Sequence, residues 1–232
     1  MRPRPHANLS PIVALAALAL AVCLAAPVPA QEAKAQSSIK LPPPRLASEA
    51  SVEQALQARR SLRSFGAAPL ALAEVGQLLW AAQGITDARG RRTAPSAGAL
   101  YPLELFLVAG NVAGLPAGVY RYVPASHELL PVVAGDRRQK AAAACRQSWV
   151  AEAPAAVAFT AVFARTAKKY GERSVRYVPF EAGAAAENLA LQAVALGLGT
   201  TVVGAFDDAE LAAALGAAGD EKPLALMPVG RK

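Results

Sequence analysis

The stretch PSAGALYPLELFLV, residues 95–108, joins a loop of small residues to an apolar run that continues to Ala109. Residues 95–98 are small and lie between prolines, a composition typical of a turn. Residues 103–109 are apolar almost throughout, which is typical of a strand buried on both faces. Small residues would let the backbone of 95–98 approach a flat ligand, and Ser96 adds a hydroxyl. An ordinary loop before a strand explains the same residues.

Helical and strand patterns alternate irregularly on both sides of this stretch. Apolar spacing predicts helices that cover residues 52–60, 72–82, 136–147, 180–196 and 207–215. Runs rich in apolar residues predict further strands over residues 119–123, 129–133, 155–164, 199–203 and 224–229. Because a doubly wound parallel sheet would need regular alternation, we expect a single α+β domain.

The composition excludes several classes of protein. The chain has 232 residues, of which 54% are hydrophobic and 18% charged, so it is not a disordered chain. Two cysteines cannot form a disulfide framework. The net charge of +7 by itself allows a nucleic-acid binder. No basic–aromatic interleaving or known module supports that alternative, so we expect no nucleic-acid partner.

The first 30 residues have the layout of a secretory signal peptide. Arg2 and Arg4 precede the apolar run at 12–26, and small residues before Gln31 predict cleavage after Ala30. The run is shorter than the roughly 20 residues of a membrane-spanning helix. We therefore expect an exported protein, periplasmic or secreted, with no stable membrane span after cleavage. A retained N-terminal membrane anchor is the alternative.

The expected mature chain has a flexible, proline-containing linker over residues 31–47 and a folded domain over 48–232. It keeps one histidine, His127, and lacks both GxGxxG and the phosphate-binding GxxxxGK[ST] motif. A Ser-His-Asp system or a histidine-based metal site is thus not expected. We identify no catalytic side chain and no metal site. This pattern favours chemistry supplied by a bound cofactor.

Three further groups of residues suit a phosphorylated ligand. Arg59, Arg60, Ser61 and Arg63 place three guanidiniums and a hydroxyl within five residues. A solvated basic helix end explains them equally well. Leu198 and Gly199 lie where a helix turns into a strand, so their backbone amides could face a ligand or simply form a tight turn. Arg231, in the basic C-terminal tail, could close over a phosphate or remain solvated.

These groups, in this order, resemble the nitroreductase-like FMN flavoprotein family, and most of all its SagB-type dehydrogenase subgroup. The matching segments are IKLPPP at 39–44, RRSLRSF at 59–65, LLWAAQGIT at 78–86, TAPSAGALYPLELFLV at 93–108, GVYRY at 118–122, KKYGER at 168–173, EAGAAAENLALQAVALGLG at 181–199, GAFDD at 204–208 and PVG at 228–230. The resemblance spans nearly all of residues 39–230. It implies a nitroreductase-like fold, in which helices flank a central mixed, mainly antiparallel sheet, and a homodimer.

The resemblance also implies FMN, bound non-covalently at the interface of the homodimer. The residues that it places around FMN are Arg59, Arg60, Ser61 and Arg63 at the phosphate, ribityl or pyrimidine side, Pro95, Ser96, Ala97 and Gly98 along the ring, Leu198 and Gly199 at its other face, and Arg231 at the phosphate. The implied activity is ping-pong hydride transfer to or from a small molecule or a peptide-derived heterocycle. NAD(P)H is the commonest electron donor in the family.

Two positions depart from the subgroup's pattern. Where many of its members read EAGH followed by QN, this chain has Ala184 and Glu187. The loss of a polar group favours a second hypothesis, a non-catalytic exported flavin-binding or partner protein with the same fold.

Overall fold

The computed structural model describes residues 1–2 and 37–232. Contacts divide the chain into Met1–Lys34 and Ala35–Lys232, and the helices and strands of the described part all lie in the second unit. Except for Met1 and Arg2, the predicted signal peptide lies outside the described residues. Within the described part, no helix is both long and apolar enough to cross a membrane.

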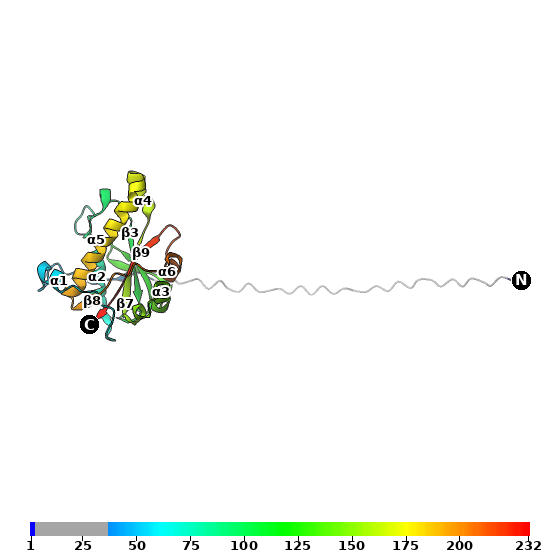
Figure 1. Ribbon diagram of the computed structural model, residues 1–232, viewed down its shortest axis with the longest axis horizontal. Coiled ribbons are helices and arrows are strands. Elements are labelled where there is room, and N and C mark those ends of the chain that lie inside the picture. The colour runs from blue at the N-terminus through cyan, green and yellow to red at the C-terminus, as the bar shows by residue number, and fades with distance from the viewer. Residues whose placement is uncertain (3–36) are drawn as a thin grey trace. The chain divides into compact units, whose positions relative to one another are not determined.

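Seven strands form one sheet (Figure 1). Their spatial order is β1 (Ile39–Lys40), β6 (Glu128–Ala134), β5 (Gly118–Val123), β3 (Leu103–Ala109), β7 (Ala155–Ala161), β9 (Lys222–Arg231) and β8 (Leu198–Thr200). Every neighbouring pair in this sheet is antiparallel. The prediction of a mixed sheet was therefore wrong in this respect. The parallel pair, β2 (Leu70–Ala71) with β4 (Val112–Ala113), forms a separate small sheet.

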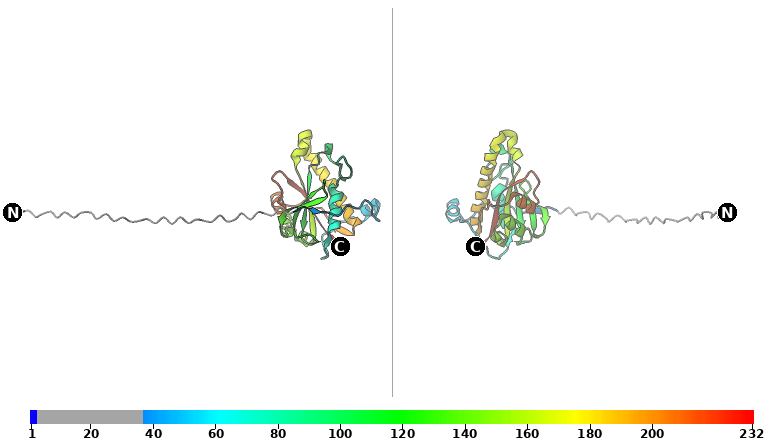
Figure 2. Two further views of the ribbon diagram at one scale, coloured as in Figure 1. Left: turned by 180° about the vertical axis from the view of Figure 1, so that it is seen from behind. Right: turned by 45° about the vertical axis from the view of Figure 1, so that its right-hand side comes forward.

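Helices cover both faces of the large sheet (Figures 1 and 2). One face packs against α2 (Leu72–Gln83) and α5 (Ser174–Ala195), and the other against α3 (Arg138–Cys145) and α6 (Asp208–Leu215). Side chains of β3 alternate between two cores: Leu105 and Leu107 face α2 and α5, while Phe106 and Val108 face α3 and α6. This confirms the expected strand that is buried on both faces.

The remaining elements are short. They are α1 (Val52–Ala58), α4 (Phe163–Tyr170), and three 3₁₀ turns, η1 (Ala97–Ala99), η2 (Ser148–Glu152) and η3 (Gly171–Arg173). Local caps explain several helix boundaries. The Ser51 hydroxyl accepts a hydrogen bond from the Gln54 backbone N–H and the Gln54 side chain accepts one from Ser51, a capping box that starts α1. Asp207 caps α6 in the predicted manner.

Two helices differ from the prediction. Helix α4 begins at Phe163, within residues that we expected to continue a strand. Helix α5 begins at Ser174 and includes Pro179, although its predicted start was residue 180. Proline removes one backbone hydrogen bond from a helix, so its presence favoured the later start.

The folded domain extends further towards the N-terminus than the predicted boundary at Ser48. Strand β1 pairs with β6, Leu41 is buried, and the Arg45 backbone N–H donates to Gln77. Residues 39–45 of the predicted flexible linker are therefore part of the domain.

Candidate functional site

Helix α5 contacts both groups of predicted site residues. Near its C-terminal half, Glu187 lies 3.7 Å from the Arg59 guanidinium. Near its N-terminal half, Glu181 Oε1 accepts a hydrogen bond of 2.8 Å from the Ala97 backbone N–H. The two glutamates are six residues apart, which is about 9 Å along a helix and about 120° around it. The segment 59–63 and the loop 95–98 therefore meet α5 on different faces.

The basic residues at 59–63 differ in what their side chains contact. Arg59 pairs with Glu187, and Arg60 donates to the backbone carbonyls of Gln57 and Arg59. Ser61 and Arg63 are exposed, and within the described residues their side chains have no hydrogen-bond or ion-pair partner. Among the arginines of this cluster, Arg63 thus offers its whole guanidinium to a ligand.

Leu198 and Gly199 lie in β8, which is next to the segment 59–63. The Leu62 backbone N–H donates to the Thr200 carbonyl at 3.0 Å, which holds the segment along the edge of β8. The Leu198 side chain is fully buried in the core. A Cβ atom at Gly199 would overlap the side chain of Leu62, whose own Cβ would be 2.9 Å away. Glycine at 199 is therefore required by packing, and a ligand could reach this pair only through their backbone.

The Arg231 side chain also has a partner. Its Nη2 atom donates to both carboxylate oxygens of Glu74 at 3.0 Å. The same carboxylate accepts a hydrogen bond from the Ala71 backbone N–H and so starts α2. The end of β9 is thereby fixed to α2, and Arg231 could reach a phosphate only by sharing or leaving Glu74.

The loop 95–101 has an unusual backbone. The φ angles of Gly98, Ala99 and Tyr101 are +63°, +53° and +45°, in a region that non-glycine residues rarely occupy. Hydrogen bonds hold the loop in this shape: Ala97 donates to Glu181, and the Tyr101 backbone N–H donates to Ser96 Oγ at 2.9 Å. Since Ser96 Oγ accepts in this contact, its own O–H is free to donate elsewhere.

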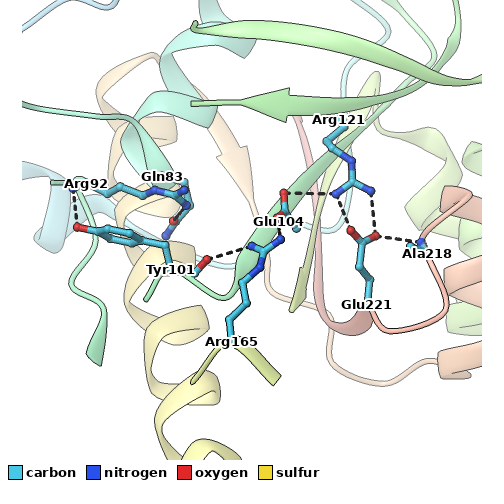
Figure 3. A network of polar contacts seen from close by, with 8 residues as sticks. All are labelled: Gln83, Arg92, Tyr101, Glu104, Arg121, Arg165, Ala218 and Glu221. Atoms are coloured by element: carbon cyan, nitrogen blue, oxygen red, sulfur yellow. Dashed lines mark hydrogen bonds and ion pairs between the residues drawn. The ribbon is translucent and has the colours of Figure 1, made fainter. Parts of the chain in front are cut away.

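Arginines hold the far end of the loop (Figure 3). Arg165 donates to the Tyr101 carbonyl at 3.2 Å and pairs with Glu104 at 2.6 Å. Arg92 donates its backbone N–H to the Tyr101 hydroxyl, and its guanidinium lies 4.5 Å from the centre of the Tyr101 ring. Burial lowers the pKa of Arg92. The loop is thus held from both ends before any ligand binds.

Two groups of residues around the loop were not predicted, one from α4 and one from α5. Lys169 and Tyr170 of α4 lie against Gly98, where a Cβ atom would be 3.2 Å from Lys169 Nζ and 2.9 Å from the Tyr170 hydroxyl. Tyr177, Phe180 and Glu181 of α5 line a hollow of about 330 Å³ together with Pro95, Ser96 and Ala97. The KKYGER motif at residues 168–173 contains Lys169 and Tyr170. Because a strand was expected up to residue 164, the helix that carries these two residues was not predicted.

The structure thus brings Pro95, Ser96, Ala97 and Gly98 together in one loop, and Arg59, Arg60, Ser61 and Arg63 together beside β8. The hollow that Pro95, Ser96 and Ala97 line has no residue of 59–63 in its lining. Residues 1–2 and 37–232 also contain no cluster of three potential metal-binding side chains.

Comparison with known proteins agrees with this geometry. The sequence profile of the Nitroreductase family matches residues 56–231. A Methanocaldococcus jannaschii protein that carries a provisional nitroreductase name is 44% identical over 185 residues, which are 79% of this chain and 92% of the relative. The microcin B17-processing protein McbC of Escherichia coli is 30% identical over 128 residues, 53% of this chain and 47% of McbC.

Solved structures show the same fold. A provisionally named nitroreductase from Ralstonia eutropha superposes with a TM-score of 0.74 and 30% identity, covering 85% of this chain and 90% of that one. A chain of the Escherichia coli microcin synthetase McbBCD complex, which has truncated pro-MccB17 bound, gives a TM-score of 0.66 and 25% identity over 90% of this chain and 83% of that one.

Proposed function

This chain belongs to the nitroreductase family, and we propose that it is an FMN-dependent oxidoreductase that transfers hydride in ping-pong fashion. The observation that carries the proposal is the loop 95–101. Its left-handed backbone is held by Glu181, Ser96 and Arg165, and its Ser96 hydroxyl remains free to donate. A rigid surface of small residues suits a flat ring, because little conformational freedom is lost on binding.

The residues at 59–63 and 95–98 fit FMN in chemical type. Arg63 and Ser61 are exposed and can bind phosphate oxygens, and the loop can lie along a ring. When bound, FMN supplies hydride transfer, so the chain needs no nucleophile or histidine of its own. The other contacts expected with FMN remain predictions, because their residues already have hydrogen-bond or ion-pair partners or are covered by other side chains. These residues are Arg59, Arg60, Arg231, Leu198 and Gly199.

We propose that FMN binds between two copies of the chain in a homodimer. This is supported by the two groups of site residues, which meet α5 on different faces, and by the hollow beside the loop 95–98, whose lining contains no residue of 59–63. It is also supported by large apolar side chains on the surface of α1 and α5, namely Val52, Leu56 and Val175, which are 65%, 53% and 70% exposed. In a homodimer one copy would supply Arg63 and the other the loop.

The proposed substrates are small molecules or peptide-derived heterocycles, with NAD(P)H as a candidate electron donor. The similarity to McbC, a protein named for processing microcin B17, supports the second class and the SagB-type subgroup. A non-catalytic flavin-binding protein is the alternative. Turnover of NAD(P)H with quinone or nitroaromatic acceptors would separate the two, because the alternative predicts bound FMN without turnover.

The test of FMN binding uses Arg63→Ala and two ligands. A charge-assisted hydrogen bond contributes about 1.5–3 kcal/mol, so the variant should bind FMN about 10- to 150-fold more weakly. Riboflavin lacks the phosphate, so its affinity should change much less. Fluorescence titration of both proteins with both ligands gives the comparison.

Arg89→Ala is the matched control, because Arg89 is an exposed arginine in a loop distant in sequence from the cluster. Equal loss of FMN and riboflavin in Arg63→Ala would contradict the phosphate contact. If wild-type protein binds neither ligand, the proposed function itself is wrong.

We also propose that the chain is exported after cleavage behind Ala30, as residues 12–30 predict. N-terminal sequencing of protein from its native host should then begin at or near Gln31. A protein that keeps Met1 and resists carbonate extraction from membranes would instead support the anchored alternative.

A further inference from the structure

The hollow beside the loop 95–98 has an apolar wall and a single charged group. Pro95, Ala97, Tyr177 and Phe180 supply its apolar surface, and its volume is about 330 Å³. Its lining residues come from the loop and from the N-terminal half of α5. Helix α4 packs beside α5 (Figure 1). A flat apolar group could therefore lie against the aromatic side chains within reach of the loop.

Glu181 is the charged group. The residue is 6% exposed, and its Oε1 atom accepts the hydrogen bond from the Ala97 backbone N–H. Within the described residues, Oε2 has no hydrogen-bond or ion-pair partner. Within the described residues the fully enclosed oxygens without a partner are those of Thr160 and Thr166, so Oε2 of Glu181 keeps some exposure. Glu181 is one of the residues that line the hollow. A carboxylate oxygen in this position can only accept hydrogen bonds.

The basic residues nearby do not neutralise Glu181. Lys169, Arg173 and Arg176 are exposed, and none forms an ion pair with Glu181 within the described part of the chain. Solvent and salt screen such exposed charges. A charge that is nine-tenths buried without a cation is costly, and a bound cation would reduce that cost.

We propose that this hollow is the substrate subsite and that Glu181 selects a flat apolar molecule carrying a protonated nitrogen. The inference rests on the proposed function, because the loop 95–98 is the proposed surface for the flavin ring. The apolar walls hold the flat group, and Oε2 of Glu181 accepts a hydrogen bond from the N–H of the cationic group. An anionic group of the same size would meet the buried carboxylate and be rejected.

The test compares three para-substituted nitrobenzenes of similar shape: 4-nitrobenzylamine, 4-nitrobenzyl alcohol and 4-nitrobenzoate. Their dissociation constants are measured by calorimetry on the FMN-loaded protein without an electron donor. The amine should bind about tenfold more tightly than the alcohol, since its ammonium group forms an ion pair with the carboxylate in addition to the hydrogen bond that the alcohol can also donate. The benzoate should bind more weakly than the alcohol.

Glu181→Gln removes the charge and keeps an oxygen that can accept from Ala97. It should abolish the preference for the amine, so the ratio of amine affinity to alcohol affinity is the readout, and FMN affinity is measured alongside to detect any change in the loop. Glu172→Gln, an exposed carboxylate in η3, should keep the preference. Phe180→Ala should weaken all three ligands alike.

Three results would overturn the inference: no preference for the amine in the wild type, a preference that survives in Glu181→Gln, or equal loss of all ligands and FMN in that variant. The last would mean that Glu181 only supports the loop.

These failures differ from failure of the proposed function, which is seen as absence of FMN binding by the wild type. In that case the same three ligands are titrated against the flavin-free protein, where an absent amine preference overturns the inference independently.

Discussion

Arg63 differs from the other predicted phosphate-binding arginines in having no partner within the described residues. Arg59 pairs with Glu187 and Arg231 with Glu74, carboxylates more than 100 positions away in the sequence. A local motif shows that basic residues are clustered, but it cannot show which of them already has a partner. The sequence therefore predicts which residue types gather in a segment, while the tertiary structure determines which of their side chains are available to a ligand.

Gly98→Ala should damage the loop. At φ +63° a side chain costs roughly 1–2 kcal/mol. The added Cβ would also lie 2.9 Å from the Tyr170 hydroxyl and 3.2 Å from Lys169 Nζ, so these side-chain ends or the loop must shift. We expect lower stability in urea unfolding and weaker FMN binding. Gly90→Ala is the control: φ is +76° but the space around it is open, so only the backbone cost applies. Equal effects of the two variants on FMN binding would contradict a role for the loop.

His127 fixes the N-terminal segment to the sheet. The Pro42 carbonyl accepts from Nε2–H at 3.0 Å, so Nδ1 of the neutral ring accepts from the Tyr122 hydroxyl at 2.9 Å. Burial is the main cause that lowers the pKa of His127 below its usual value. Folding therefore favours the neutral ring, and the unfolded chain binds a proton more readily.

The stability of the protein should accordingly fall as the pH drops below about 6.5, the ordinary histidine value, and this loss should level off once the folded state is also protonated. His127→Asn removes the titrating group, and asparagine tolerates the positive φ of +53° at this position. Urea unfolding from pH 7.5 to 5 should show a smaller decrease for the variant than for the wild type. Parallel curves for the two proteins would exclude His127 as the cause.

At the scale of elements, the sequence predicted helices and strands correctly where all the local residues favoured the same structure. The strand at Leu103–Ala109 and the capped starts of α1 and α6 follow from local residues. Helices α4 and α5 were misjudged because Phe163 follows a β-rich run and Pro179 lies inside a helix. Packing against the sheet outweighs these local preferences. Helix α4 carries Lys169 and Tyr170. Because this helix was not predicted, these two residues beside the loop were not predicted either.

Arg121→Met should destabilise the protein on the order of 3 kcal/mol, because it leaves Glu221 without its cation in a poorly solvated place. Glu104 also loses this cation but keeps its ion pair with Arg165. Arg121 pairs with Glu221 at 2.6 Å and Glu104 at 3.3 Å, and the Glu221 side chain is 6% exposed (Figure 3). Arg91→Met breaks an exposed pair with Asp87 and should destabilise the protein much less, because solvent screens exposed ion pairs. Urea unfolding of both variants provides the comparison, and equal costs would be inconsistent with this network stabilising the sheet.

At the scale of the molecule, the α+β class and the helix-flanked sheet were predictable from apolar patterns and motifs together. The pairing of strands was not, because it depends on contacts between residues far apart in the chain. The same holds for the placement of the two groups of site residues on different faces of α5.

This placement gives a test of the proposed homodimer. Chains with Arg63→Ala and chains with Gly98→Ala are mixed after partial unfolding and refolded together. If each flavin takes Arg63 from one chain and the loop from the other, mixed dimers contain one intact site and recover tight FMN binding at a fraction of sites. If one chain supplies both groups, every site keeps a defect and mixing restores nothing. Light scattering establishes whether dimers form.

Strand β1 has a consequence for the behaviour of the protein at high concentration. Within the described residues it is the outer neighbour of β6, and it covers that strand through Ile39 and Lys40 alone. The rest of β6 carries the half-exposed Leu130 and Val132, separated by Pro131, which has no N–H to offer a new strand. An uncovered sheet edge is a template for pairing between molecules. Proteolytic removal of residues 37–41 would thus uncover the whole edge of β6 for pairing between molecules, which Pro131 and the charge of Glu128 would oppose.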